Sequence, residues 1–453
     1  MAALAAQGLR VGAAKVGPDY IDTGYHALAT GRPSRNLDAW MCGAGPIPAI
    51  AAKAAAGCDI LVVEGVMGLF DGAARGAGSG AQTPGVPQAE DRHTNEGLTM
   101  VGSTAHVAEL LDAPVILVVD AAALSGSVAA IVHGYSTLRV APVVHGVILN
   151  RVGSHSHEEM LRDALEPLGI PVVGALRRDP SITWRDRHLG LVPVVEQPAD
   201  ARRALGGLAE QIRSQCDLEL LCQIARRAPD RDIPSGEAPA LPQRPKVRVA
   251  VASGPAFSFM YPDNIEAMEA GGAEVVPFDP LVDACLPAGV HGLFAGGGFP
   301  EVYAQQLANN HRLLGALREQ IAAGLVIWAE CGGLLWLSEA LDGITMAGAV
   351  PCRARMTEHR TLGYRTARTR GASPLGPAGT TLRGHEFHYS VVDPPGSALE
   401  MTGRMGPSTG GFASPSLFAS YLHQHLGGTP GLAEHFVRRC ARDRPSGDLS
   451  TDA

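Results

Sequence analysis

The chain has 453 residues, of which 46% are hydrophobic and 18% charged, with a formal net charge of −8. This composition excludes a disordered chain, a collagen and a coiled coil, and the length suffices for two or three domains with sizeable cores. No dense Lys/Arg cluster indicates nucleic-acid binding, and no apolar run approaches the roughly 18 residues of a membrane span. The eight cysteines are scattered without a CxxC pair. We therefore expect a cytoplasmic protein with reduced thiols.

Short apolar runs alternate with Ala-rich helical patterns through the first half of the chain. The predicted strands are 9–15, 59–64, 115–120, 144–150 and 171–176, and the helices between them include 47–57 and 104–111. Apolar runs without polar alternation are typical of strands buried on both faces. The pattern thus predicts a parallel sheet covered by helices.

Residues 226–245 contain five prolines and few apolar side chains, which predicts an exposed linker. Beyond it the alternation restarts, with predicted strands at 247–252, 275–278, 292–294 and 326–329. We predict an α/β protein of two doubly wound parallel-sheet domains, at 1–225 and 246–440, with a polar tail at 441–453.

The segment GLVIWAECGGLLWL (324–337) contains the strongest site motif. An apolar strand runs into Cys331, and a helical pattern begins after two glycines. A nucleophile at such a turn sits on a tight bend, with the following backbone N–H groups facing the reacting carbonyl. The helix N-terminus also favours thiolate over thiol. We therefore predict that Cys331 is a nucleophile and not a buried structural cysteine.

Two further motifs supply what a thiol nucleophile needs. The run AGGGFP (295–300) places three glycines at a strand end, either as a flexible turn or as an oxyanion hole. An imidazole base is available in GHEFHYS (384–390) or SYLHQHL (420–426). His423 and His425 alternate along a strand-like segment, so only one of them can face the site. The four histidines could instead bind a metal, although no HExxH motif or carboxylate set accompanies them.

Together these motifs resemble the class I glutamine amidotransferases. The resemblance implies that Cys331 attacks the glutamine carboxamide with His423 as its partner, and that water hydrolyses the glutamyl thioester after ammonia leaves. The usual acid two residues after the histidine is replaced by His425, so the orienting third member is missing or comes from elsewhere. The backbone donors of the oxyanion hole are expected at Gly297, Gly298 and Gly332.

Acidic residues follow two predicted strands of the first half. Asp19 lies beyond one strand end in KVGPDYIDTGYH (15–26). In DILVVEGVMGLFDG (59–72), Glu64 ends the next strand and Asp71 follows a glycine-rich turn. Open α/β sheets bind ligands at the carboxyl ends of their strands, and Mg²⁺ prefers carboxylate oxygens. These acids therefore predict a Mg²⁺ site, the alternative being that each merely caps a helix.

The whole set of motifs resembles the cobyrinate (hydrogenobyrinate) a,c-diamide synthase family of the corrin pathway. The likeness spans nearly the whole chain and is carried by KVGPDYID, RPSRNLD, VEGVMGLFDG, RHLGLVP, SGPAFSFMYPDN and GHEFHYS. It implies a ligase of cobalamin biosynthesis that phosphorylates the c- and then the a-acetate carboxylate and lets ammonia displace the phosphate. The cofactors implied are ATP and Mg²⁺. The partners implied are glutamine and hydrogenobyrinic or cobyrinic acid, and a homodimer is left open.

Residue roles are implied by the same resemblance. Glu64 and Asp19 are expected to bind the metal, Lys15 a phosphate or carboxylate, and Asn150 the adenine base. The residues expected to handle the substrate or intermediate are Asp19, Tyr20, Ile21 and Asp71.

One departure from the family pattern concerns the phosphate-binding loop. Its motif, GxxxxGK[ST], does not occur, and the start MAALAAQGLRVGAAK reads as the middle of the helix that should follow it. Without the loop, the N–H cradle and the phosphate lysine are missing. We expect that the polypeptide as written cannot perform amidation, although Cys331 could still hydrolyse glutamine. A start assigned too late explains this better than a truncated, ATP-inactive chain, because every downstream motif is intact.

Rival interpretations remain open at this point. A cobyric acid synthase shares both domain types, but RPSRNLD and GHEFHYS favour the a,c-diamide type. A non-catalytic corrinoid-binding or regulatory protein and a metal hydrolase built on the four histidines are further alternatives. The sequence leaves open whether the corrin contains cobalt, and its Ala/Gly/Arg-rich composition leans towards the cobalt-free substrate.

Overall fold

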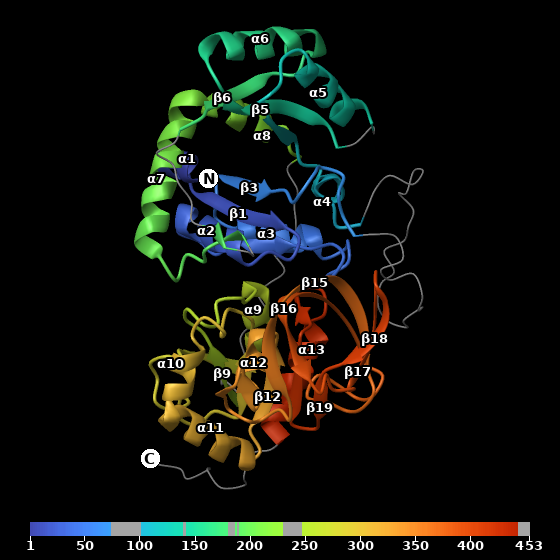
Figure 1. Cartoon of the computed structure of the whole chain (residues 1–453). Helices are drawn as coiled ribbons and strands as arrows, with labels where there is room; N and C mark the ends of the chain where they lie inside the picture. The colour runs from blue at the N-terminus through green and yellow to red at the C-terminus, as the bar shows by residue number, and fades with distance from the viewer. Residues whose placement is uncertain (74–100, 139–141, 180–185, 188–189, 230–246, 443–453) are drawn as a thin grey trace, which may run out of the picture. The chain divides into compact units, whose positions relative to one another are not determined.

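The computed structural model describes residues 1–73, 101–138, 142–179, 186–187, 190–229 and 247–442, shown in Figure 1. The described residues form two compact units, one on each side of residues 230–246. Most of the predicted linker and of the predicted tail lies outside the described residues, so the domain limits stay predictions. Among the described helices, none is both long and apolar enough to cross a membrane.

The first unit contains two three-stranded parallel sheets. One has the order β2 (Arg35–Leu37), β1 (Val11–Val16), β3 (Ile60–Glu64), and the other the order β4 (Val115–Asp120), β5 (Val144–Val152), β6 (Val172–Arg177). Strands β7 (Asp186–Arg187) and β8 (Gly190–Leu191) pair with each other. The sequence predicted one sheet here, and the structure differs because β3 and β4 are not paired. Apolar runs specify buried strands, but they do not specify which strands pair.

Helices cover both of these sheets. Helix α3 packs on β1 through Ile47 and Ile50, and α5 and α6 pack on β5 through Val128 and Leu161. The helices of this unit are α1 (Ala2–Ala6), α2 (Ile21–Thr30), α3 (Ile47–Ala55), α4 (Thr104–Leu111), α5 (Ser127–Thr137), α6 (His155–Leu165), a 3₁₀ turn (Glu166–Leu168), α7 (Pro198–Gln215) and α8 (Leu218–Ala225).

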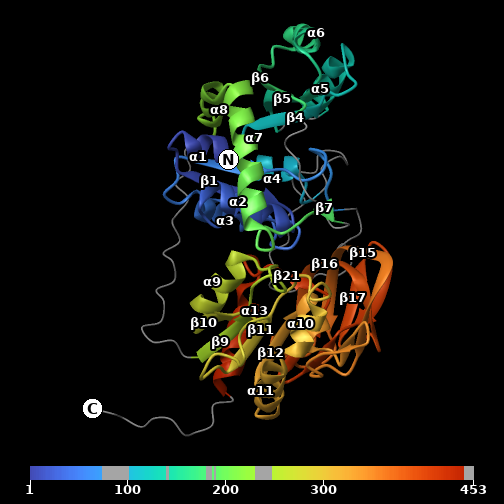
Figure 2. The same ribbon diagram turned by 60° about the vertical axis from the view of Figure 1, so that its left-hand side comes forward.

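The second unit is built on a six-stranded sheet that helices sandwich (Figure 2). Its order is β10 (Ala273–Phe278), β9 (Val247–Ala252), β11 (Gly292–Ala295), β12 (Val326–Glu330), β20 (Leu417–Ser420), β19 (Phe412–Ser414), parallel except for β19. Leu317 and Trp336 belong to the core on one face, and Met268 and Phe436 to the core on the other. The helices concerned are α10 (Ala304–Asn309), α11 (His311–Ala322) and α12 (Gly332–Leu337) on the first face, and α9 (Pro262–Ala270) and α13 (Pro430–Arg442) on the second.

A second, largely antiparallel sheet in this unit was not predicted. Its order is β14 (Ile344–Thr345), β13 (Ala340–Leu341), β15 (Arg353–Thr369), β16 (Thr381–Asp393), β21 (His423–Gln424). Strands β17 (Leu399–Gly403) and β18 (Gly406–Gly410) extend it from β15. The pairing of β16 with β21 sets His385 directly opposite His423.

The nine predicted strands are all present, with limits that differ by at most two residues from those observed. Both predicted helices, now α3 and α4, are present as well. The α/β class with parallel sheets is therefore confirmed.

Candidate active site

Cys331 occupies the turn between β12 and α12, as predicted. Its backbone has φ +46° and ψ −100°, a conformation that residues other than glycine rarely adopt. The Cys331 N–H donates to the carbonyl of Ser420 at 2.8 Å, and the Gly333 N–H donates to that of Gly296 at 2.9 Å. Strained backbone held by its surroundings is frequent at functional sites. The geometry matches the bend expected of a nucleophile.

The glycines predicted to form the oxyanion hole lie against this turn. A Cβ atom built on Gly332 would lie 3.0 Å from the backbone nitrogen of Gly298. A Cβ on Gly333 would overlap the carbonyl oxygen of Ala295, so the strand end of β11 and the start of α12 approach as closely as glycine permits.

His423 lies against the same glycine loop. A Cβ on Gly297 would overlap Cε1 of the His423 ring. His385 stacks on His423 with centroids 4.8 Å apart and planes 12° apart, and the Tyr261 hydroxyl lies 3.1 Å from His385 Nε2. The loop at Gly297 and Gly298 therefore lies against both the Cys331 turn and the His423 ring.

His425 has different surroundings from His423. Its ring packs on Tyr261 at 4.5 Å, and its Nε2 lies 3.9 Å from Asp263 Oδ2. The two histidines of SYLHQHL thus have different acidic neighbours, and the prediction that only one of them faces the site stays a prediction. No group of three His, Cys, Asp or Glu able to hold a metal is present among the described residues, so the four histidines give no metal cluster there.

Burial controls the electrostatics of this site. Cys331 is 6% exposed and His423 is 2% exposed. Burial raises the pKa of the Cys331 thiol, which is the opposite of the shift predicted from the helix N-terminus. Burial, together with His385 and His388, lowers the pKa of His423 well below its usual range. The Cys331 thiol and the His423 imidazole are thus both uncharged, and the neutral imidazole can accept the thiol proton.

Glu330 is a residue of this site to which the sequence reasoning gave no role. It ends β12 directly before Cys331 and is 2% exposed. Its Oε2 lies 3.9 Å from Nδ1 of His423. The available signal was a single acid at the end of an otherwise apolar strand, which is costly to bury unless it has a partner.

A cavity of about 350 Å³ opens beside the Cys331 turn. Its wall includes Leu334, three residues beyond Cys331, and Ser420, whose carbonyl accepts from the Cys331 N–H. Arg365 of β15 and Glu386 of β16 also line it, with Arg365 Nε 2.9 Å from Glu386 Oε2. A buried cation and a buried acid thus face a cavity next to the nucleophile.

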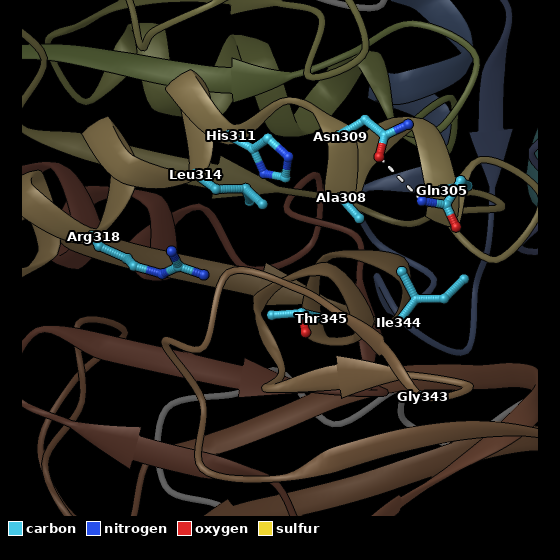
Figure 3. Close-up of a pocket in the computed structure, with 9 residues that line it drawn as sticks. All are labelled: Gln305, Ala308, Asn309, His311, Leu314, Arg318, Gly343, Ile344 and Thr345. Carbon is cyan, nitrogen blue, oxygen red and sulfur yellow. Dashed lines mark hydrogen bonds between the residues drawn. The ribbon is translucent and has the colours of Figure 1, made fainter.

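A second cavity of this unit, of about 480 Å³, lies between α10, α11 and the β13–β14 hairpin (Figure 3). Gln305 and Asn309 hydrogen-bond to each other across one wall, as the dashed line in Figure 3 marks. Arg318 donates to the carbonyls of Met346 and Ala347. The residues that line this cavity include no acid, whereas Glu386 and Ser420, whose carbonyl accepts from the Cys331 N–H, line the other cavity. The cavity beside Cys331 is therefore the better candidate site.

The Gly297→Ala variant tests whether the glycine loop lies directly against the His423 ring. The added methyl group would overlap Cε1 of His423, so the ring must shift. We expect ammonia release from glutamine to fall by about 10²-fold, the cost of a misplacement of about 1 Å. The control is Gly315→Ala on α11, where a Cβ meets nothing within 4 Å and activity should be unchanged. Wild-type activity in Gly297→Ala would contradict this placement of His423.

In the first unit, Lys15 and Glu64 meet at the carboxyl ends of β1 and β3, where they are paired in register. Lys15 Nζ lies 3.2 Å from Glu64 Oε1 and 2.7 Å from Asp22 Oδ2, and it donates to the Gly65 carbonyl at 3.1 Å. Burial alone would lower the pKa of Lys15, but Asp22 and Glu64 outweigh it and the net shift is upward. Lys15 is therefore a buried, charged ammonium group.

The predicted Mg²⁺ ligands do not form a metal site in this structure. Glu64 Oε1 contacts Lys15, and Glu64 Oε2 forms a short contact with Nε2 of His26, a residue the sequence reasoning left without a role. Asp19 Oδ1 accepts the N–H groups of Ile21 and Asp22 and caps α2, which is the alternative set aside above. The described residues contain no set of three possible ligands. With these carboxylates held by Lys15, His26 and the start of α2, the arrangement does not fit Mg²⁺.

The remaining predicted residues of the first unit have local roles. Tyr20 and Ile21 form the start of α2. Asp71 Oδ2 accepts the Gly68 N–H at 2.9 Å and closes the glycine-rich turn. Asn150 Oδ1 accepts the N–H of Arg151 at 2.9 Å near the end of β5. None of these contacts joins Asp71 or Asn150 to Lys15, Asp22 or Glu64, so the predicted roles of Asp71 and Asn150 stay predictions.

Two family models together match most of the chain. The model described as a CobQ/CobB/MinD/ParA nucleotide binding domain matches residues 1–192, and that described as a CobB/CobQ-like glutamine amidotransferase domain matches residues 248–430. With the fold and the Cys331 turn, they define a glutamine-dependent amidotransferase ligase that has a nucleotide-binding domain. The nucleotide-binding domain implies the use of ATP.

Full-length relatives then identify the family. Hydrogenobyrinate a,c-diamide synthase of Streptomyces coelicolor is 45% identical over 97% of this chain and 93% of its own, and that of Thermobifida fusca is 41% identical over 98% and 93%. Cobyrinate a,c-diamide synthase of Syntrophotalea carbinolica is 41% identical over 97% and 94%. The chain belongs to the cobyrinate/hydrogenobyrinate a,c-diamide synthase family. The nucleotide-binding model matches from residue 1, so the comparisons give no support to the prediction of a missing phosphate-binding loop.

Proposed function

We propose that this chain amidates the a- and c-acetate carboxylates of hydrogenobyrinic or cobyrinic acid, with glutamine as the nitrogen donor and ATP as the energy source. A free carboxylate is too poor an electrophile for ammonia. Transfer of the γ-phosphoryl group of ATP to the carboxylate gives an acyl phosphate and ADP, and ammonia then displaces phosphate to give the amide. The convergence of Cys331, the glycine loop and His423 is the observation that carries the proposal.

The glutaminase half begins with attack by the Cys331 sulfur on the carboxamide carbon. His423 takes the thiol proton as the C–S bond forms, and backbone N–H groups at Gly298 and Gly332 stabilise the oxyanion. The proton then passes to the leaving nitrogen as the C–N bond breaks, which yields ammonia and a glutamyl thioester. Water hydrolyses the thioester to glutamate and restores the thiol.

Glutamine is recognised, in this proposal, by the cavity that Arg365 and Glu386 line. The substrate carries an α-carboxylate and an α-ammonium group, and the cavity offers one buried group of each opposite sign. Burial raises the pKa of Glu386 although Arg365 acts against the shift, so the pair is costly to keep without a ligand. A bound zwitterion would give each member a second partner.

Arg365→Gln tests this assignment. Loss of the guanidinium should raise KM for glutamine by at least about tenfold, because a hydrogen bond to a charged group contributes about 1.5–3 kcal/mol. The turnover number should change much less, since the reacting atoms are untouched. The matched control is Arg370→Gln, because Arg370 Nε also lies 2.9 Å from a glutamate, Glu400, but that pair is exposed. An unchanged KM in Arg365→Gln would place glutamine elsewhere.

The function itself is tested by incubating the protein with ATP, glutamine and each corrin acid in turn. We expect ADP, glutamate and a diamide to form, and the ratio of kcat/KM for the two acids decides whether the natural corrin contains cobalt. Corrin binding without ammonia release or amide formation would favour the non-catalytic alternative.

A further inference from the structure

The site contains an acid at the position where a catalytic histidine needs one. In a Cys–His site of this kind, a third group usually fixes the ring through Nδ1 and leaves Nε2 for the thiol. Glu330 Oε2 lies 3.9 Å from His423 Nδ1, and both side chains are almost completely buried. Parallel pairing of β12 with β20 fixes the position of Glu330, which is in register with Ser420.

We propose that Glu330 is the positioning residue of His423. It takes the place of the acid that related enzymes have two residues after the histidine, where this chain has His425. Its carboxyl oxygen, 3.9 Å from Nδ1, is the acceptor that holds the ring proton on Nδ1, which leaves Nε2 unprotonated and able to take the Cys331 proton. This inference rests on the glutaminase chemistry proposed above and assigns to it a residue that touches neither the substrate nor the reacting sulfur.

The histidines near His423 have contacts of a different kind. His425 Nε2 lies 3.9 Å from Asp263, and its ring packs on Tyr261, so its surroundings differ from those of His423. His385 stacks on the face of the His423 ring, which fixes the plane but supplies no in-plane acceptor. The Glu330 carboxyl group, 3.9 Å away, faces Nδ1 of this ring.

Glu330 can accept a hydrogen bond from His423 even when its carboxyl group is uncharged. Burial raises the pKa of Glu330 well above its usual range, although the nearby Gln424 backbone acts against the shift. The carbonyl oxygen of a neutral carboxyl group still accepts a hydrogen bond. Glu330 Oε1 is also buried and makes no hydrogen bond within the described part of the chain. Such an orphaned atom costs stability and calls for a functional reason.

The experiment compares Glu330→Leu with Glu330→Gln in the full chain. We expect Glu330→Leu to lower kcat for ammonia release by about 10²-fold, as for a misplaced catalytic group, with KM for glutamine unchanged. Glu330→Gln keeps an acceptor oxygen and should recover activity to within about tenfold of wild type. Amidation with ammonium chloride in place of glutamine bypasses the site and should be unchanged in both variants.

Asp263→Asn is the matched control, since Asp263 is equally buried and lies equally far from a histidine outside the Cys331 site. It should keep its glutaminase kcat per folded molecule. Equal losses in Glu330→Leu and Asp263→Asn, or a rise in KM with kcat retained, would overturn the inference. Cys331-dependent ammonia release by the wild type is measured first. Its absence would refute the proposed function, whereas its presence with a fully active Glu330→Leu would refute only the role of Glu330.

Discussion

Replacing Cys331 with alanine is expected to abolish ammonia release from glutamine while amidation with added ammonium chloride continues. We expect the glutamine-dependent rate to fall by at least about 10⁴-fold, because loss of a catalytic nucleophile costs up to about 10⁶-fold in kcat. Alanine adds no atoms at the +46° backbone of this turn, so the glycine loop and α12 should keep their positions. The measurement is the rate of amide formation with each nitrogen source.

The control for this experiment is Cys352→Ala. Cys352 is also buried, and burial raises the pKa of its thiol to about 12, so it matches Cys331 in environment but lies outside the site. The substitution leaves a small cavity and should cost stability but not the glutaminase reaction. Equal activity with glutamine in Cys331→Ala and wild type would refute the assignment of the nucleophile. Loss of activity with both nitrogen sources would show that the turn supports the fold and not only the chemistry.

The elements that the sequence predicted well are those whose signals are local. Strands such as β9 and β12 are continuous apolar runs, and the Cys331 turn is a strand followed directly by two glycines and a helical pattern. Even the strained conformation of Cys331 follows from this order of residues. Local patterns of this kind need no knowledge of which segments meet in space.

The features that the sequence did not predict depend on pairings between distant segments. His385 stacks on His423 because β16 and β21 pair across a separation of almost forty residues. Glu64 was expected at a metal, yet it is held by Lys15, its partner in the register of β1 and β3, and by His26. The thiol pKa was predicted to fall at a helix N-terminus, but α12 has six residues and the burial of Cys331 outweighs it. In each case a distant neighbour or the degree of burial decided the outcome.

Replacing Lys15 with methionine is expected to stop amidation with either nitrogen source and to leave ammonia release from glutamine intact. Lys15 is 5% exposed, and its ammonium group is the cation that meets Asp22 and Glu64 at the strand ends. If Lys15 contacts the phosphate or carboxylate of the amidation step, its loss removes one fixed electrostatic contact, which costs about 10²–10³-fold. The two acids also lose their buried partner, so the melting temperature should fall.

The measurement that separates these effects is the rate of ammonia-dependent amidation per folded molecule, at a temperature below the transition of the variant. Lys53→Met provides the control, because Lys53 is exposed on α3 and its loss should leave the amidation rate unchanged. Amidation at the wild-type rate in folded Lys15→Met would show that this lysine only neutralises Asp22 and Glu64. Loss of glutamine hydrolysis as well would show that Lys15 affects the second unit, which the division of the chain into two compact units does not predict.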